Sequence, residues 1–191
     1  EGASPVKVGV AWIDIITGLY AGNAILAALF ERERSGKTQR LDISLWDCAI
    51  ASLANQGQNF LISGENPGLM GSGHPNLVPY QAFEATDGWI IIAIGSDRQW
   101  QKFCKKVNAK LQWVTNQERV VNREQVSQFV QDLIKNKTKQ EIQTQLEGIP
   151  TSPINKISEA LADPQSIARG VLSQYQGNQV LASPLRFMTS E

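Results

Sequence analysis

An uncharged apolar segment from Ile15 to Phe30 is the feature that most constrains how this chain can fold. The segment is shorter than the roughly 20 apolar residues that span a bilayer, and Asp14 and Glu31 flank it, so we expect a buried helix rather than a membrane span. The helix is predicted over about residues 17–34. Small residues recur along it and leave a face that a neighbouring element can approach closely: Gly18, Ala21, Gly22, Ala24, Ala27 and Ala28.

Segments with the character of β-strands lie on both sides of this helix. Residues 8–13 precede it, and residues 41–45 follow it and alternate apolar with polar side chains. Gly36 is expected to end the helix in a left-handed conformation, and a second helix is predicted to begin near Asp47. The order strand, helix, strand, helix is typical of α/β proteins. We therefore predict a partial Rossmann-like large α/β domain over residues 1–62.

Glycine and proline interrupt this pattern over residues 63–76, which are predicted to form a loop or linker. A smaller α+β domain is predicted over residues 77–165, and residues 166–191 are predicted to be a return segment toward the large domain. The clearest local signal is Asp87-Gly88 between two apolar runs, which is typical of a β-hairpin. The predicted elements are strands at 80–85, 89–94, 154–157, 171–175 and 180–185, and helices that begin near Asp97, Asn122, Thr138, Ser158 and Pro164.

Composition argues against several classes of function. The chain has 18 Lys and Arg and 18 Asp and Glu, so it has no excess charge for binding nucleic acid or an anionic membrane surface. His74 is the sole histidine, and Cys48 and Cys104 lie far apart, so a metal site or a Ser-His-Asp triad lacks its residues. We expect no metal, reduced cysteines and a cytoplasmic protein, with mitochondria or peroxisomes as the eukaryotic alternatives. The first residues lack the pattern of a secretory leader, which agrees with this expectation.

Asp14 is the candidate for covalent chemistry. It lies between the first strand-like segment and the predicted helix, where unpaired N–H groups and the helix dipole stabilise an ionised carboxylate. An ionised, partly desolvated carboxylate can attack an activated carbonyl. Thr17 is a good N-cap for the same helix, so capping does not require Asp14. A carboxylate that merely caps or solvates the start of the helix is the alternative interpretation.

The loop from Gly71 to Asn76 is the second candidate site. Glycine lets the backbone approach a ligand closely and switch between open and closed positions. An ordinary linker and a histidine with a structural role are the alternatives. The candidate substrate-loop residues are Gly71, Ser72, Gly73 and His74.

Three blocks of sequence together resemble the class III CoA-transferases, the CaiB/BaiF family. Residues 10–47 contain an aspartate, Thr-Gly, a helix of small residues and the segment RSGKTQ, in the order of the active-site region of this family. Residues 71–104 resemble the family's glycine loop and the start of its small domain, and residues 159–170 resemble its later Asp-Pro and Ala-Arg-Gly element. Thr38 stands where the family usually has glycine, so we expect a local difference in that turn.

The resemblance implies an acyl-CoA:carboxylate CoA-transferase in which Asp14 is the nucleophile. Its carboxylate would form a mixed anhydride with the donor acyl group and then an aspartyl-CoA thioester, before the acceptor acid takes the CoA. The glycines of the loop would close over these intermediates and donate N–H groups to the oxyanion. Coenzyme A enters as the acyl-CoA substrate, together with a carboxylic acid, and short dicarboxylates are the expected acids.

The resemblance also bears on assembly. Most of the family's CoA-binding surface lies in an N-terminal half that this sequence does not contain, so we expect the chain by itself to be incomplete for CoA binding and turnover. The family forms interlocked homodimers, and we expect the same of the complete protein. On this piece alone, the helix after Thr17 is expected to expose an apolar surface.

Two alternatives stay open. A 2-methylacyl-CoA racemase of the same family would use the aspartate as an acid or base with a partner histidine, but the family's histidine lies upstream and His74 does not match it. A non-catalytic fragment or interaction domain is the second alternative. Arg119 and Arg123 are candidates to bind a substrate carboxylate, with plain surface charge as the simpler interpretation.

Overall fold

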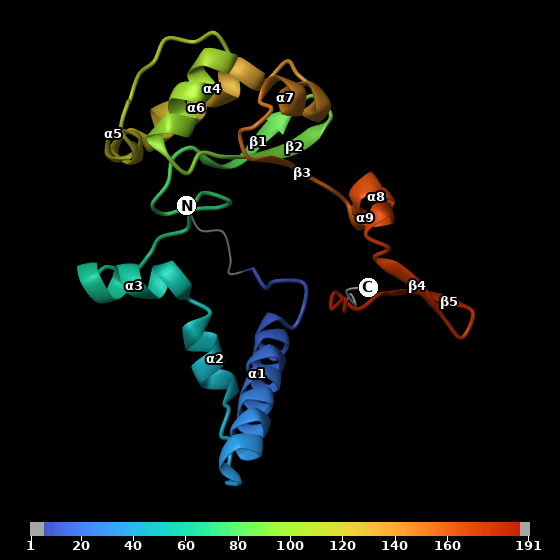
Figure 1. Cartoon of the computed structure of the whole chain (residues 1–191). Coiled ribbons are helices and arrows are strands. Elements are labelled where there is room, and N and C mark those ends of the chain that lie inside the picture. Colours follow the sequence, from blue (N-terminus) through green and yellow to red (C-terminus); the bar gives the residue numbers. More distant parts are fainter. Residues whose placement is uncertain (1–5, 188–191) are drawn as a thin grey trace. The chain divides into compact units, whose positions relative to one another are not determined.

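The computed structural model describes residues 6–187 and divides into two compact units, Glu1–Leu69 and Met70–Glu191 (Figure 1). The division falls inside the glycine- and proline-rich segment 63–76. Helices and strands are both present, so the mixed α/β class that the sequence predicts is confirmed.

The first unit consists of helices that follow one another along the chain: α1 (Trp12–Ser35), α2 (Leu45–Ala51) and α3 (Ala54–Ser63). α1 ends where predicted, because Gly36 has a left-handed φ of 71° and its N–H donates to Arg32. The hydroxyl of Ser44 caps α2 by accepting the N–H of Asp47 at 3.0 Å. One helix was predicted from Asp47, but the structure has two, α2 and α3. The backbone of Ala54 interrupts the helical conformation between them with a φ of 47°. α1 packs against α2.

The two strands predicted in this unit do not form. Among the described residues, neither 8–13 nor 41–45 pairs with another strand. α1 begins at Trp12 rather than near Thr17, and its first turn takes up the end of the first segment. Because a strand is stabilised by the ladder it forms with a neighbour, an apolar or alternating pattern without that neighbour does not make one.

The second unit is built around an antiparallel sheet in the order β1-β2-β3: β1 (Tyr80–Ala85), β2 (Gly88–Ala93) and β3 (Thr151–Ile154). The predicted hairpin is confirmed, and Gly88 supports its turn with a φ of 132° that glycine adopts readily. β3 pairs Trp89 with Ile154 and lies three residues earlier than predicted. The reason is that Lys156 already starts the next helix, where its N–H donates to Glu159.

The second unit also contains α4 (Asp97–Lys106), α5 (Asn116–Val121), α6 (Arg123–Ile134) and α7 (Lys139–Gln145) (Figure 1). Three of these helices, α4, α6 and α7, share one apolar core cluster with the sheet. Burying one large apolar side chain contributes about 1.5–3 kcal/mol, so this cluster is the main source of stability in the unit. Its fully buried members come from the three helices, from the strands and from residues next to them: Val78, Phe83, Ile90, Ile92, Ile94, Trp100, Phe103, Val126, Val130, Ile134, Ile142 and Leu146.

The helix starts of the second unit agree with the prediction in part. The capping box of Thr138 and Glu141 is confirmed at the start of α7. α4 begins at Asp97, but the cap is the hydroxyl of Ser96. α6 follows Asn122, whose side chain donates to the carbonyl of Glu118 and does not cap. α5 lies between two predicted helices and was not predicted.

The C-terminal part of the described chain comprises α8 (Ile157–Ala162), α9 (Pro164–Ala168) and a hairpin of β4 (Leu172–Tyr175) and β5 (Asn178–Leu181). Two strands were predicted here, and they pair as a hairpin in whose turn Gly177 has a φ of 80°. No residue from 157 to 187 is buried. The prediction that this part returns toward the large domain stays a prediction.

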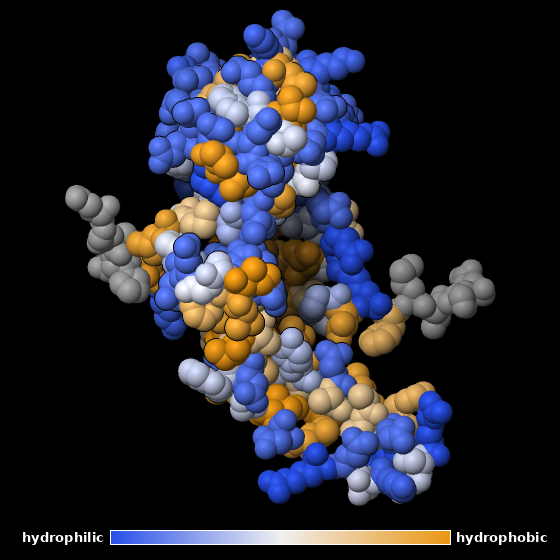
Figure 2. Space-filling model, turned by 90° about the vertical axis from the view of Figure 1, so that its left-hand side faces the viewer, coloured by the Kyte–Doolittle hydropathy of each residue, from blue (hydrophilic) through white to orange (hydrophobic). Residues whose placement is uncertain are grey.

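α1 exposes its apolar side chains, contrary to the expected burial. It is the one described helix long and apolar enough to cross a membrane by length and composition, yet none of its residues is buried against other parts of this chain. Leu19 is 64% exposed and Leu26 is 68% exposed. Figure 2 shows hydrophobic side chains reaching the surface over wide areas. The apolar surface predicted for this helix is therefore present.

Candidate active site

Asp14 lies in the first turn of α1, as its third residue. The predicted cap is wrong: the hydroxyl of Thr17 donates to the carbonyl of Ile13 at 2.7 Å, inside the helix, and the N-cap position is Ala11, whose side chain cannot cap. The first-turn N–H groups of α1 thus lack a side-chain cap, and their positive potential acts on the carboxylate of Asp14.

The carboxylate of Asp14 is accessible. Among the described residues it has no hydrogen-bond or ion-pair partner, and its residue is exposed. The partial desolvation expected from the sequence is therefore not provided by the described part of this chain. Since no salt bridge engages its oxygens, they are free to attack an electrophile.

The glycine loop is compact. Gly71 has a left-handed φ of 57°, and the N–H of Gly73 donates to the carbonyl of Met70 at 2.9 Å. A methyl group on Gly73 would lie 3.1 Å from that same carbonyl oxygen and 3.7 Å from Nη1 of Arg123. Glycine is therefore favoured at position 71 by the backbone conformation and at position 73 by the close approach of the Met70 carbonyl.

The loop is docked on the outer edge of β1, the edge that faces away from β2. The N–H of His74 donates to the carbonyl of Tyr80 at 2.8 Å, and the hydroxyl of Ser72 accepts the N–H of Ala82 at 3.0 Å. Further along the same edge, the side-chain amide of Gln131 both donates to and accepts from the backbone of Glu84. The loop and helix α6 together thus form hydrogen bonds with most of the backbone groups on this edge of β1.

His74 has a structural role in this conformation. Its Nδ1 accepts the N–H groups of Asn76 and Leu77, both at 3.1 Å, and its ring stacks on Tyr80 with the centroids 5.1 Å apart. Two donors aimed at Nδ1 require a lone pair there, so the neutral ring carries its proton on Nε2. The structural alternative for His74 is the one that these contacts favour.

The base of the loop is held by side chains from α5 and α6. Arg123 donates from Nη1 to the carbonyl of His74 at 2.9 Å and from Nη2 to the carbonyl of Pro75 at 2.7 Å. Asn116 donates to the carbonyl of Asn76 at 2.8 Å and accepts the N–H of Val78 at 3.2 Å. Arg123 is therefore not plain surface charge, and its hydrogen bonds go to the backbone rather than to a substrate.

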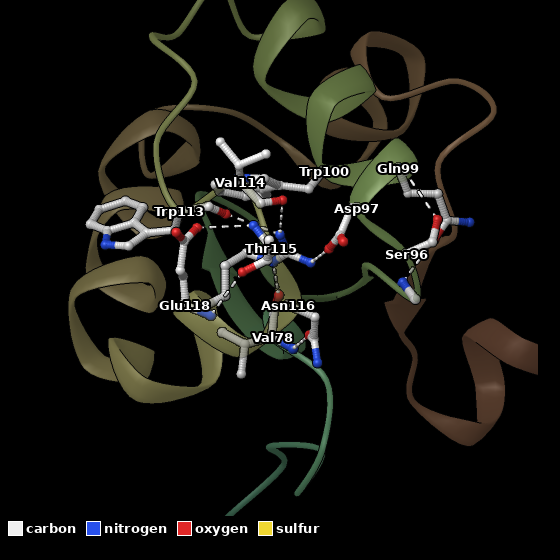
Figure 3. A network of polar contacts seen from close by, with 12 residues as sticks. Val78, Ser96, Asp97, Gln99, Trp100, Trp113, Val114, Thr115, Asn116 and Glu118 are labelled. Carbon is white, nitrogen blue, oxygen red and sulfur yellow. Dashed lines mark hydrogen bonds and ion pairs between the residues drawn. The ribbon is translucent and has the colours of Figure 1, made fainter.

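Arg119 is the donor in a polar network whose acceptors Val78, Asp97, Trp113 and Val114 are labelled in Figure 3. It donates to the backbone carbonyls of Val78, Trp113 and Val114 and pairs with Asp97, and its guanidinium lies 5.5 Å from the ring centroid of Trp100. The side chain is completely buried. Neither interpretation of Arg119 from the sequence is correct, because a buried arginine with these partners binds no substrate and is not surface charge.

A signal for this network was present in the sequence. Thr115 and Glu118 have the spacing of a capping box, and the structure forms one at the start of α5. Recognising it would have predicted α5, and with it the helical positions of Asn116 and Arg119.

The N–H groups of the loop tip are available for a ligand. In the described part of the chain, Gly73, His74, Asn76 and Leu77 use theirs within the loop or on β1, whereas Gly71 and Ser72 have no hydrogen-bond acceptor. No group of three or more potential metal ligands is found among residues 6–187. The structure therefore offers an unpaired carboxylate in the first turn of α1 and, in the second unit, a glycine loop with two free donors.

The chain belongs to CoA-transferase family III, whose model matches residues 1–190. It is 40% identical over 174 residues to a succinate–glutarate CoA-transferase of Agrobacterium fabrum, covering 87% of this chain and 44% of that protein. It is 31% identical over 183 residues to the human succinyl-CoA:glutarate CoA-transferase, covering 92% of this chain and 42% of that protein.

A solved structure supports the same assignment. The crystal structure of a CaiB/BaiF family protein from Brucella suis is similar with a TM-score of 0.75 and 40% identity, over 97% of this chain and 51% of that chain. The chain spans less than half the length of the two curated relatives.

Proposed function

We propose that the protein is an acyl-CoA:carboxylate CoA-transferase in which Asp14 is the nucleophile. The observation that carries the proposal is the free carboxylate in the uncapped first turn of α1, in a chain of CoA-transferase family III. Membership in that family supports the reaction class, and the position of Asp14 supports the choice of residue.

In the first half of the proposed reaction, an oxygen of Asp14 attacks the thioester carbonyl and CoA leaves as the thiolate. The product is a mixed anhydride between Asp14 and the donor acid. The thiolate then attacks the aspartyl carbonyl carbon, and the donor acid leaves as a carboxylate, which gives an aspartyl-CoA thioester.

The second half repeats these steps with the acceptor acid. Its carboxylate attacks the aspartyl thioester, CoA leaves as the thiolate, and a second anhydride forms. The thiolate attacks the acceptor acyl carbon, which releases the new acyl-CoA and restores the carboxylate of Asp14. Water takes no part, so each activated intermediate must be kept from hydrolysis.

The glycine loop is proposed to shield these intermediates and to stabilise the oxyanion. The free N–H groups of Gly71 and Ser72 are suited to the second task, because the other loop donors that face the protein are already used. His74 is assigned no proton transfer, since its Nδ1 accepts two backbone N–H groups.

Succinate and glutarate, or dicarboxylates of similar length, are the proposed acids. The support comes from the names of the bacterial and human relatives, which pair succinate or succinyl-CoA with glutarate. We further propose that the complete protein is a homodimer, that its CoA-binding surface lies mostly outside this sequence, and that it acts in the cytoplasm. Fractionation of the native cells with an antibody against the protein tests the last point.

The racemase alternative predicts a different chemical result. A racemase would release the α-proton of a 2-methylacyl-CoA to solvent, whereas a transferase would exchange labelled succinate into the CoA ester. The proton assay with a 2-methylacyl-CoA and the exchange assay with labelled succinate separate the two. A protein without either activity would support the interaction-domain alternative.

The decisive experiment traps the aspartyl intermediate. The protein at its full encoded length is incubated with succinyl-CoA and quenched with hydroxylamine, and the peptide that contains Asp14 is analysed by mass spectrometry. We expect a hydroxamate on Asp14 and none in Asp14→Asn, which should also lose transfer activity. Asp47→Asn is the matched control, because Asp47 is likewise an exposed carboxylate in a helical first turn. Retained transfer in Asp14→Asn would overturn the proposal.

A further inference from the structure

Arg123 makes an uncommon connection between a helix and a loop. It is the first residue of α6, and its two terminal nitrogens reach the carbonyls of the consecutive residues His74 and Pro75, at 2.9 Å and 2.7 Å. Hydrogen bonds from a charged donor are roughly twice as strong as neutral ones, and a planar guanidinium fixes the orientation of both acceptors. This geometry fixes the carbonyls of two consecutive peptide units in the loop.

The charge of Arg123 is directed to the loop. Among the described residues it has no carboxylate within ion-pair distance, so the two carbonyls are its principal partners. Burial lowers the pKa of its guanidinium, but an arginine stays protonated at neutral pH. Its Nη1 also lies 3.7 Å from the position of a Cβ on Gly73, which places the charge directly behind the loop tip.

The contacts divide the loop into a fixed base and a lightly held tip. The base, residues 74–77, is held by Arg123, Asn116, the edge of β1 and the ring of His74. The tip, residues 71–73, is held to the rest of the unit by the hydrogen bond between the hydroxyl of Ser72 and the N–H of Ala82. Gly73 is the tip residue next to the base.

We propose that Arg123 is a positioning residue that fixes the base of the glycine loop, so that only the tip moves between open and closed positions. Its effect on transfer rests on the proposed function, because a fixed base returns the tip to the same closed position on each turnover. Loss of Arg123 frees the base as well, and the loop then closes in many positions that admit water.

Hydrogen exchange tests, without relying on activity, whether Arg123 fixes the base of the loop. Overlapping peptides across residues 64–80 are followed by mass spectrometry in the protein at its full encoded length. In the wild type, the amides of Gly71 and Ser72 should exchange at least tenfold faster than those of His74, Asn76 and Leu77. In Arg123→Met, which keeps the apolar stem but removes the donors, the base should exchange roughly tenfold faster or more.

The controls separate a local effect from unfolding. Arg98→Met removes an exposed arginine of the same unit, which has no hydrogen-bond partner among the described residues, and should leave the loop unchanged. Core amides on β2 report on global stability. The proposal would be overturned if the base were protected equally in Arg123→Met and wild type. It would also be overturned if exchange in Arg123→Met rose as much on β2 as in the base of the loop.

The kinetic half measures the ratio of thioester hydrolysis to transfer with succinyl-CoA and glutarate. We expect this ratio to rise at least fivefold in Arg123→Met, with KM for the CoA ester within twofold of wild type, and to recover partly in Arg123→Lys. If Arg123→Met only destabilised the protein, a smaller fraction would be active, but the ratio of hydrolysis to transfer would not change. An unchanged ratio would therefore contradict the proposal. If the wild type forms no adduct on Asp14, the proposed function fails, and the exchange result still decides whether Arg123 fixes the base.

Discussion

The guanidinium of Arg119 and the carboxylate of Asp97 form an ion pair of 2.8 Å that joins α5 to the first turn of α4. The two partners differ in environment, because the side chain of Arg119 is 0% exposed and that of Asp97 is 47% exposed. Asp97 can therefore be solvated when its partner is lost, whereas Arg119 depends entirely on protein acceptors.

This asymmetry predicts unequal costs of substitution. Arg119→Met leaves the buried carbonyl of Val78 and the partly buried carbonyls of Trp113 and Val114 without this donor and should reduce the free energy of unfolding by about 3 kcal/mol or more. Asp97→Asn keeps an acceptor at a half-exposed position and should cost about 1 kcal/mol or less. Urea denaturation measures both, and equal costs would show that the ion pair itself is the dominant interaction.

The two loop glycines should respond differently to substitution. Gly71→Ala meets no neighbouring atom but retains a left-handed φ, which should cost about 1 kcal/mol of stability. Gly73→Ala brings a methyl group against the carbonyl of Met70, and Gly73→Val increases this crowding. We expect the ratio of thioester hydrolysis to transfer to rise from Gly73→Ala to Gly73→Val. An unchanged ratio in Gly73→Val would remove the shielding role of the tip.

Cys104 should be inert toward thiol reagents in the folded protein. It is buried in the core of the second unit, and burial raises the pKa of its thiol, so little of it is thiolate near pH 8. In a Cys48→Ser background, reaction of Cys104 with a chromogenic disulfide should be at least about tenfold slower than in urea. A native rate equal to the unfolded rate would mean that this core opens readily.

The capping box of α7 should make stability depend on pH. The carboxylate of Glu141 accepts the N–H and the hydroxyl of Thr138, and these bonds lower its pKa in the folded state. The stabilisation is therefore present above the unfolded-chain value of about 4.3 and is lost as pH falls through the lower folded-state value. Melting temperatures of wild type and Glu141→Gln should differ most near pH 7 and converge near pH 3. Glu147→Gln, outside the box, should show no such convergence.

The exposed stripe of α1 should lie in an interface of the complete protein. Leu19 and Leu26 lie on one face of the helix, and a bare apolar surface of this kind is a common mark of a protein–protein contact. The double substitution of both leucines by lysine should halve the mass measured by light scattering, whereas Glu31→Lys on the same helix should not. A monomeric wild type would contradict the proposed homodimer.

Local patterns in the sequence predicted the second unit well because its signals are satisfied locally. Asp87-Gly88 gives a hairpin turn, Thr138 and Glu141 cap one another, and both outcomes depend on residues only a few positions apart. The first unit was predicted less well. Residues 8–13 and 41–45 have the composition of strands, but strand formation depends on a partner that these patterns do not identify.

The candidate site shows the same division. Asp14 and the loop from Gly71 to His74 could be selected from residue type and spacing, whereas Arg123 could not. The partners of Arg123 lie 48 and 49 positions earlier in the chain, so its role depends on how α6 packs on β1. Single-sequence patterns carry no information on such distant pairs, and the charge of Arg123 suggested only a substrate carboxylate or the protein surface.

The docking of Ser72 and His74 on the outer strand has a consequence for solubility. An uncovered strand edge is a template on which another polypeptide can add, and this is how many sheet proteins begin to aggregate. The glycine loop, together with Gln131, thus covers the free edge of β1 and blocks the addition of another strand there. Shortening the loop to widen access to the site would leave that edge bare and favour fibrous or amorphous precipitation.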